Sequence, residues 1–259
     1  MAEGPPLRGA NPSPSGVPDR GQRVGNGGRT MQVAAFFDFD GTLYSGHLWK
    51  DMSDYFRERR ERTGLIWTYL LAHMALWPLN LMRVLSDERF YGSWARDLTW
   101  VLRGLSLEEG DALFRLILEW RILPGLRPDV LERLRHHQAQ GHTVMLVSGG
   151  FRRLLEMLAA ELSIPHVVGT EAEVRDGRYT GRPTGLAITG RGKVEGIRRL
   201  AAREGLDLDW PHSYAYADNR TDIPLLEAVG HPVAVYPDRV LAAHAQKSGW
   251  EVLGTIARP

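Results

Sequence analysis

Apolar and polar positions alternate in blocks along the chain, and the blocks predict strands and helices in turn. The first apolar run, residues 33–37, is followed by turn-forming residues, which is typical of a strand buried on both faces. After residue 126, helix-type and strand-type patterns follow one another, and this order predicts a doubly wound parallel sheet of the Rossmann-like α/β class. The predicted strands are 33–37, 143–147, 165–168, 213–217 and 232–235, and the predicted helices of the core are 127–139, 151–162, 192–204, 221–229 and 238–246.

A long insert separates the first strand from the rest of this core. Residues 46–123 carry helix-type patterns throughout, and they predict an all-helical domain between two parts of the α/β core, 31–45 and 124–259. Ser106 and Glu109 have the spacing of a capping box at the start of one of these helices.

The first 30 residues differ from both parts in composition. They are rich in glycine, proline and arginine and hold almost no large apolar side chain. Such a segment buries too little surface to offset the entropy lost on ordering, so we predict a disordered tail. It contains no apolar run of signal-peptide length, and we expect a cytoplasmic protein.

Charge and cysteine content narrow the functional classes. The 32 basic and 31 acidic residues leave a net charge of +1, so no overall charge attracts nucleic acid, and no nucleic-acid partner is expected. Cysteine is absent, which excludes disulfides, thiolate metal sites and cysteine nucleophiles.

Polar side chains stand at the ends of three predicted strands. Because the carboxyl ends of parallel strands share one edge of a sheet, we expect these side chains to meet in a crevice there. Several carboxylates that close together repel one another, and a cation or a shared proton relieves the repulsion. The residues concerned are Asp38 and Asp40, Ser148, and Asp218 and Asp222, with Lys193 near the start of a helix between the last two strands.

These residues resemble the motifs of the haloacid dehalogenase superfamily. The sequence Asp38-Phe39-Asp40-Gly41-Thr42 matches its nucleophile motif, and the resemblance extends over about residues 33–253. The helical insert, Ser148-Gly149-Gly150 and a hairpin over 171–180 are most similar to the phosphoserine phosphatase-like subfamily IB. Ala217 departs from the usual glycine before the last acidic motif, and Thr221 stands where asparagine is frequent.

The resemblance implies a phosphatase that forms an aspartyl-phosphate. Asp38 would be the nucleophile, and Asp40 would protonate the leaving alcohol and then activate water. Asp38, Asp218 and the backbone carbonyl of Asp40 would hold Mg²⁺. Asp222 would orient Lys193 or a metal-bound water.

The same resemblance implies how the phosphate is held. Ser148 and the backbone N–H groups of Gly149 and Gly150 would bind its oxygens, and Lys193 would neutralise charge on the phosphate and the nucleophile. Two other functions use a similar set of residues. They are a phosphotransferase or mutase of the same fold, and a phosphoacceptor regulatory domain.

The helical insert bears on the substrate. The positions where phosphoserine enzymes carry an acidic residue and an arginine that recognise the amino acid align here with His47 and Asp97. We therefore expect a small-molecule phosphomonoester other than phosphoserine, either a small phosphometabolite or a phospholipid head-group phosphate.

Residues 65–82 form an apolar stretch without a charged side chain, at about the ~18 residues needed to span a bilayer. A single span would place Asp38 and Ser148 on opposite sides of the membrane. Because both residues are expected in one active site, a single span is excluded. The stretch is then a buried helix, a homodimer face, or a surface for peripheral contact with a membrane or lipid.

Overall fold

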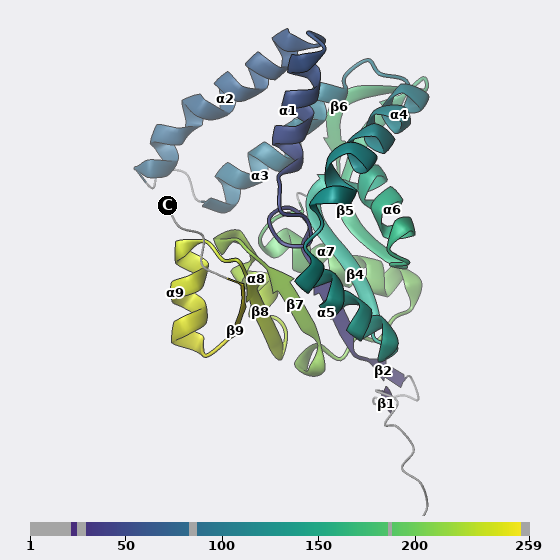
Figure 1. The fold of residues 1–259 in the computed structure, drawn as a ribbon, viewed down its shortest axis with the longest axis vertical. Helices are drawn as coiled ribbons and strands as arrows, with labels where there is room; N and C mark the ends of the chain where they lie inside the picture. Colours follow the sequence, from purple (N-terminus) through teal and green to yellow (C-terminus); the bar gives the residue numbers. More distant parts are fainter. Residues whose placement is uncertain (1–21, 25–29, 83–86, 186–187, 255–259) are drawn as a thin grey trace, which may run out of the picture.

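A mostly parallel sheet forms the centre of the structure (Figure 1), a computed structural model that describes residues 22–24, 30–82, 87–185 and 188–254. Within these residues the main sheet has seven strands in the order β6-β5-β4-β3-β7-β8-β9, and only the β5–β6 pair is antiparallel. This arrangement confirms the predicted α/β class. The strands are β3 (Ala34–Phe37), β4 (Thr143–Phe151), β5 (His166–Arg175), β6 (Arg178–Thr184), β7 (Tyr214–Ala217), β8 (His231–Val235) and β9 (Glu251–Leu253).

Strand β3 lies in the middle of the sheet, between β4 and β7. All of its side chains are fully buried, because both faces of the sheet are covered. Ala35 and Phe37 belong to one apolar core, and Ala34 and Phe36 belong to the other. The continuous apolar run thus corresponds to a strand with a core on each side.

Helices cover the two faces of the sheet. On one face, α5 (Pro128–Ala139) and α6 (Arg152–Glu161) pack on the core that contains Phe37. On the other, α7 (Arg191–Glu204), α8 (Ile223–Leu226) and α9 (Arg239–Ser248) pack on the core that contains Phe36. The sheet is therefore covered on both sides, as a doubly wound fold requires.

The elements described between β3 and β4 are helical, and α1, α2 and α3 lie together at one end of the sheet (Figure 1). The Ser106–Glu109 capping box is confirmed, since each residue bonds the backbone N–H of the other. The elements are α1 (Leu48–Glu58), α2 (Thr63–Leu81), α3 (Asp87–Asp97), a 3-10 turn (Leu98–Leu102), α4 (Leu107–Ile117), a π-helical turn (Leu118–Ile122) and a 3-10 turn (Leu123–Gly125).

Helix α2 contains most of the uncharged stretch, and it has one buried face and one exposed face. Ile66, Tyr69 and His73 are buried, whereas Trp67, Leu71 and other large apolar side chains are more than half exposed. The helix is thus neither fully buried nor fully exposed. In the described ranges, no helix has the length and hydropathy to cross a membrane.

Several element boundaries differ from the sequence prediction. Strand β4 continues past Val147 to Phe151, because pairing with β5 resumes at Phe151, opposite Thr170, after a register shift that spans the two glycines. Strand β5 likewise runs on to Arg175, where Asp176 and Gly177 form the predicted hairpin turn with positive φ at both residues.

Two predicted segments change type. The helix predicted over 221–229 is a 3-10 turn (Arg220–Asp222) followed by the short α8, because Pro224 is suited only to the first turn of a helix. Most of the tail that was predicted to be disordered, residues 1–21 and 25–29, lies outside the described residues. Within it, β1 (Gln22–Val24) pairs with β2 (Thr30–Gln32), so that part of the prediction is wrong.

Candidate active site

Asp38 follows β3 directly and is held in place by the neighbouring strand. Its backbone N–H donates to the carbonyl oxygen of Tyr216 in β7 at 3.0 Å. Its side chain is buried, and Lys193 Nζ lies 2.7 Å from its Oδ1 although the two residues are 155 positions apart. The end of the central strand therefore presents a carboxylate already paired with an ammonium.

Lys193 also contacts a second acid, since its Nζ lies 2.7 Å from Asp222 Oδ1. Burial disfavours the ammonium, but the charges of Asp222 and Asp38 and their hydrogen bonds outweigh this and raise the pKa of Lys193 above its usual value. Burial raises the pKa of Asp222 as well. Lys193 is thus a fixed cation between two carboxylates.

Asp218 follows β7 and brings a third carboxylate to the same place. The hydroxyl of Thr42 lies 3.2 Å from Asp218 Oδ1 and 3.4 Å from Asp38 Oδ2, and it links the two acids. Burial, together with the charges of Asp38 and Asp222, raises the pKa of Asp218 well above its usual value. The site therefore disfavours the ionised form of Asp218 unless a further cation is present.

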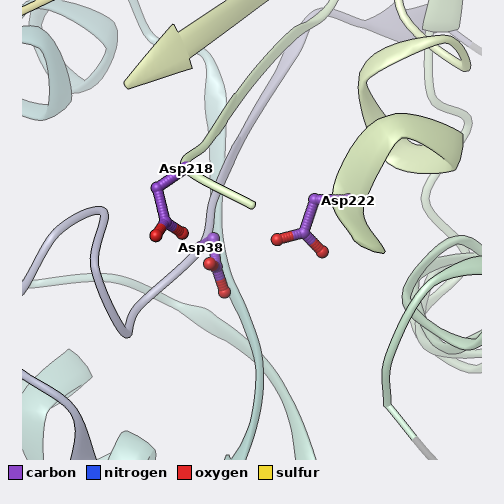
Figure 2. A group of neighbouring side chains, drawn as sticks. All are labelled: Asp38, Asp218 and Asp222. Carbon is purple, nitrogen blue, oxygen red and sulfur yellow. The ribbon is translucent and has the colours of Figure 1, made fainter. Parts of the chain in front are cut away.

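The three carboxylates point toward one another (Figure 2). One oxygen from each of Asp38, Asp218 and Asp222 lies within 4.8 Å of the others, and among the described residues this is the one group of such residues able to hold a metal. One ammonium stands against three carboxylates, so negative charge remains in excess. Oxygen ligands with an excess of negative charge suit a hard divalent cation such as Mg²⁺.

Gly41 allows this close approach. It has φ +77°, and a Cβ at this position would lie 2.1 Å from Asp218 Oδ2. Any other residue would displace the third carboxylate and strain the backbone. The glycine of the nucleophile motif is thus required by the packing of the acids.

Asp40 lies apart from the three carboxylates. Its Oδ1 accepts a hydrogen bond of 2.7 Å from the backbone N–H of Leu48, at the start of α1. Burial, aided by the charges of Asp38 and Asp51, raises the pKa of Asp40 to about 7, against the opposing effects of the Leu48 bond and Lys193. A carboxyl group with this pKa can both give and take a proton near neutral pH.

Ser148 lies within β4 and is buried. Its Oγ accepts a hydrogen bond of 3.0 Å from the N–H of Gly150. The structure brings every residue predicted for the site into one cavity of about 620 Å³. Its lining includes Asp38, Asp40, Ser148, Gly149, Gly150, Lys193, Asp218 and Asp222.

Of the two positions of the helical insert that were aligned with substrate-recognition residues, one lines the cavity and the other does not. His47 lines the cavity, and burial lowers its pKa, so it is neutral at pH 7. Asp97 does not line the cavity. It contacts Arg96 at 2.9 Å and His73 at 3.5 Å.

The sequence did not reveal two features of this site. The first is the hydroxyl of Thr42 between Asp38 and Asp218, which the motif contains but whose contacts it does not specify. The second is a set of aromatic side chains from the helical insert in the cavity wall. The only sign of this aromatic set in the sequence was its composition: six of the eight tryptophans lie between Trp49 and Trp120.

Known proteins are similar to this chain in sequence and in fold. The model of the haloacid dehalogenase-like hydrolase family matches residues 35–227. A probable phosphatase of Mycobacterium tuberculosis is 30% identical over 238 residues, which are 92% of this chain and 80% of the relative. A phosphoserine phosphatase of the same organism is 32% identical over 231 residues, 86% of this chain and 70% of the relative.

Solved structures are also similar to this chain. A Bordetella pertussis protein of unknown function has a TM-score of 0.73 at 30% identity, covering 87% of this chain and 99% of its own. A substrate-bound phosphoserine phosphatase has a TM-score of 0.58 at 19% identity, covering 89% and 95%, and shows the same fold. The family match, these relatives and the clustered acids lead to one conclusion: the chain belongs to the haloacid dehalogenase-like hydrolases and is a phosphatase of the phosphoserine phosphatase-like group.

Proposed function

We propose that the protein hydrolyses a phosphomonoester through an aspartyl-phosphate on Asp38, with Mg²⁺ as cofactor. The contact that supports this most strongly is the 2.7 Å pair between Asp38 and Lys193, at the end of the central strand. The lysine offsets the repulsion between the nucleophilic carboxylate and an incoming phosphate.

In the first step, a carboxylate oxygen of Asp38 bonds to phosphorus while the bond from phosphorus to the alcohol oxygen breaks. Asp40, protonated near neutral pH, gives its proton to that oxygen, and the alcohol leaves. In the second step, Asp40 takes a proton from water as the water oxygen bonds to phosphorus and the bond from phosphorus to the Asp38 oxygen breaks. Inorganic phosphate is released, and Asp38 and protonated Asp40 are restored.

Other residues bind rather than react. Ser148 and the N–H groups of Gly149 and Gly150 would hold phosphate oxygens, and Asp222 would keep Lys193 in position. Asp38 and Asp218 of the carboxylate cluster, with the backbone carbonyl of Asp40 as the family resemblance implies, would hold Mg²⁺, which supplies positive charge against the carboxylates and the phosphate when bound.

The rival functions share the first step but not the second. A mutase would pass the phosphoryl group to another alcohol, and a phosphoacceptor domain would keep it on Asp38. The pKa of Asp40, about 7, argues against the phosphoacceptor domain, because a group that can activate water makes the aspartyl-phosphate short-lived. The substrate class follows from the helical insert, in which Asp97 contacts Arg96 and His73 and does not line the cavity. We therefore propose a small phosphometabolite other than phosphoserine, or a phospholipid head-group phosphate.

Asp40→Asn tests the acid–base role. With Mg²⁺ present, we expect kcat/KM for an alkyl phosphate to fall by about 10²–10⁴-fold. For p-nitrophenyl phosphate, whose leaving group needs no proton, we expect a fall of less than about tenfold. Because water activation is also lost, nitrophenolate should appear as a burst of one per enzyme, followed by slow turnover.

Stopped-flow absorbance measures the burst, and chelation of Mg²⁺ in the parent protein should abolish turnover of both esters. Equal losses for the two esters would contradict the assignment of Asp40. Steady turnover of the parent protein in excess chelator would contradict the metal requirement.

We also propose that the outer face of α2 makes peripheral contact with an anionic membrane surface. Trp67, Leu71 and Met74 are 57–60% exposed on this face. The adjoining residues 57–62 carry four arginines and two glutamates, a net charge of +2 that favours anionic lipid.

A flotation assay tests this contact. We expect the protein to float with vesicles that contain anionic lipid, and the double variant Trp67→Ser/Leu71→Ser to stay in solution. The matched control, Trp120→Ser/Leu107→Ser, changes exposed side chains of the same types elsewhere in the insert and should float like the parent. Equal behaviour of the two variants would contradict the proposal, and a concentration-dependent dimer lost only in the first would assign this face to a homodimer.

A further inference from the structure

The cavity that contains Asp38 extends well beyond the catalytic residues. At about 620 Å³ it lies within the range of ~300–1,000 Å³ found for pockets that enclose drug-sized ligands, so it holds much more than a phosphate group. The side of the cavity opposite the acids comes from the helical insert. It is lined by Trp49 of α1, Tyr69 and Trp77 of α2, and Phe90 and Trp94 of α3, with Leu98 after them; we call these six residues the aromatic wall.

The rings of the aromatic wall hold one another in place. Trp94 is central, with its ring centroid 5.6 Å from Trp49, 5.5 Å from Tyr69 and 6.2 Å from Phe90, in edge-to-face contacts. Trp77 contacts Phe90 in the same way at 6.4 Å. Edge-to-face pairs are the favoured geometry of packed aromatic rings, so the wall is preorganised before a ligand enters.

The aromatic wall contains no charged side chain. The other residue from the insert in the lining, His47, is neutral at pH 7 because burial lowers its pKa. Two acids of the insert have partners elsewhere, since Asp51 accepts from the Tyr44 hydroxyl at 2.7 Å and Asp97 contacts Arg96. Among the described residues of this side, an amino-acid head group would therefore find no carboxylate to pair with its ammonium.

The core side of the cavity contributes one more apolar residue, Ile188, and a second cation besides Lys193, Arg220, which lies 3.2 Å from Asp238. Leu98 and Ile188 are aliphatic and add apolar contact area beside the rings. Mixed aromatic and aliphatic surface favours an uncharged apolar group, whose affinity grows with the area removed from water.

We infer that the aromatic wall binds the leaving alcohol of the substrate, and that this alcohol carries a bulky uncharged apolar group, either an aromatic ring or a hydrocarbon chain. The inference rests on the proposed phosphomonoesterase activity and names the substrate class of that site. Phosphoserine is excluded as a good substrate, because its ammonium and carboxylate need charged partners that the wall does not supply.

A panel of four phosphates tests the inference. We expect kcat/KM for 2-phenylethyl phosphate or octyl phosphate to exceed that for phosphoserine and for phosphocholine by at least about tenfold. The ratio of the first two distinguishes an aromatic from a hydrocarbon leaving group. Equal values for all four esters, or a preference for phosphocholine or phosphoserine, would overturn the inference.

Two variants assign the effect to the aromatic wall. Trp49→Ala removes a ring that is 37% exposed, and the matched control Trp120→Ala removes one that is 40% exposed and does not line the cavity. We expect Trp49→Ala to raise KM for the preferred apolar ester about fivefold or more, with little change in kcat or in KM for phosphoserine. The control should leave every value unchanged.

Trp77→Ala, which removes a ring at the exposed end of the aromatic wall, gives a second measurement should Trp49→Ala fold poorly. If both wall variants match the control, the wall does not bind the substrate.

Binding separates this inference from the proposed function. The non-hydrolysable 3-phenylpropylphosphonate should bind the Mg²⁺-loaded parent protein in calorimetry, and more weakly to Trp49→Ala. If no ester is hydrolysed but the phosphonate binds in this pattern, the proposed activity fails and the apolar site stands. Hydrolysis of the esters without such binding would support the proposed activity and contradict the apolar binding site.

Discussion

Asp38→Asn is expected to lower the rate of phosphate-ester hydrolysis by about four orders of magnitude or more, because an amide cannot form the aspartyl-phosphate. The replacement keeps the size of the side chain and can still accept hydrogen bonds from Lys193 and Thr42. It also removes one of three clustered negative charges. We therefore expect the loss of rate without a loss of fold.

The measurement is kcat for an aryl phosphate with Mg²⁺, together with the thermal unfolding midpoint. Asp111→Asn is the control, because Asp111 pairs with Arg153 outside the cavity and its loss should leave kcat within a factor of two. A rate for Asp38→Asn within tenfold of the parent would mean that another group attacks phosphorus.

Lys193→Met is expected to lower the free energy of unfolding by about 3–5 kcal/mol at pH 8, without metal. Lys193 is 5% exposed and lies 2.7 Å from both Asp38 and Asp222. Its removal leaves buried carboxylates without their cation. The same substitution at the exposed Lys247 should change the free energy of unfolding by less than about 0.5 kcal/mol.

The loss of unfolding free energy in Lys193→Met should depend on pH in a defined direction. Burial already raises the pKa of Asp222 and Asp218 in the folded parent, and without the lysine these values rise further. In the unfolded chain the same groups titrate near ~3.9. A raised folded pKa means that the folded state binds the proton more tightly, so the carboxyls are neutral at pH 5 and stability is lost as the pH rises through neutrality.

Urea unfolding of Lys193→Met at pH 5 and pH 8 measures this dependence. We expect the deficit relative to the parent to be clearly smaller at pH 5. The same deficit at both pH values would show that the buried charges do not cause it.

Much of the core could be predicted because its signals are local. A short apolar run such as Ala34–Phe37, followed by turn-forming residues, is typical of a central strand with both faces buried. Since parallel strands end at one edge, the acids after β3 and β7 had to lie near each other once the sheet was predicted. The Asp176-Gly177 turn needed only positive φ at adjacent residues.

Boundaries were predicted less well where tertiary contacts decide them. The extension of β4 through Gly149 and Gly150 depends on pairing with β5, and neither glycine has a strand preference of its own. The short α8 likewise depends on a turn at Asp222 that places its carboxylate on Lys193.

The order of residues along the chain determined the sheet, the edge at which the site lies and the identity of its acids, hydroxyl and lysine, because strand direction and residue type are local properties. Only the tertiary structure decided which carboxylates share the lysine and which rings of the helical insert face them. Such contacts depend on how α1, α2 and α3 pack on one another. In an apolar helix such as α2, every face has nearly the same composition, so the sequence does not indicate which face turns toward the site.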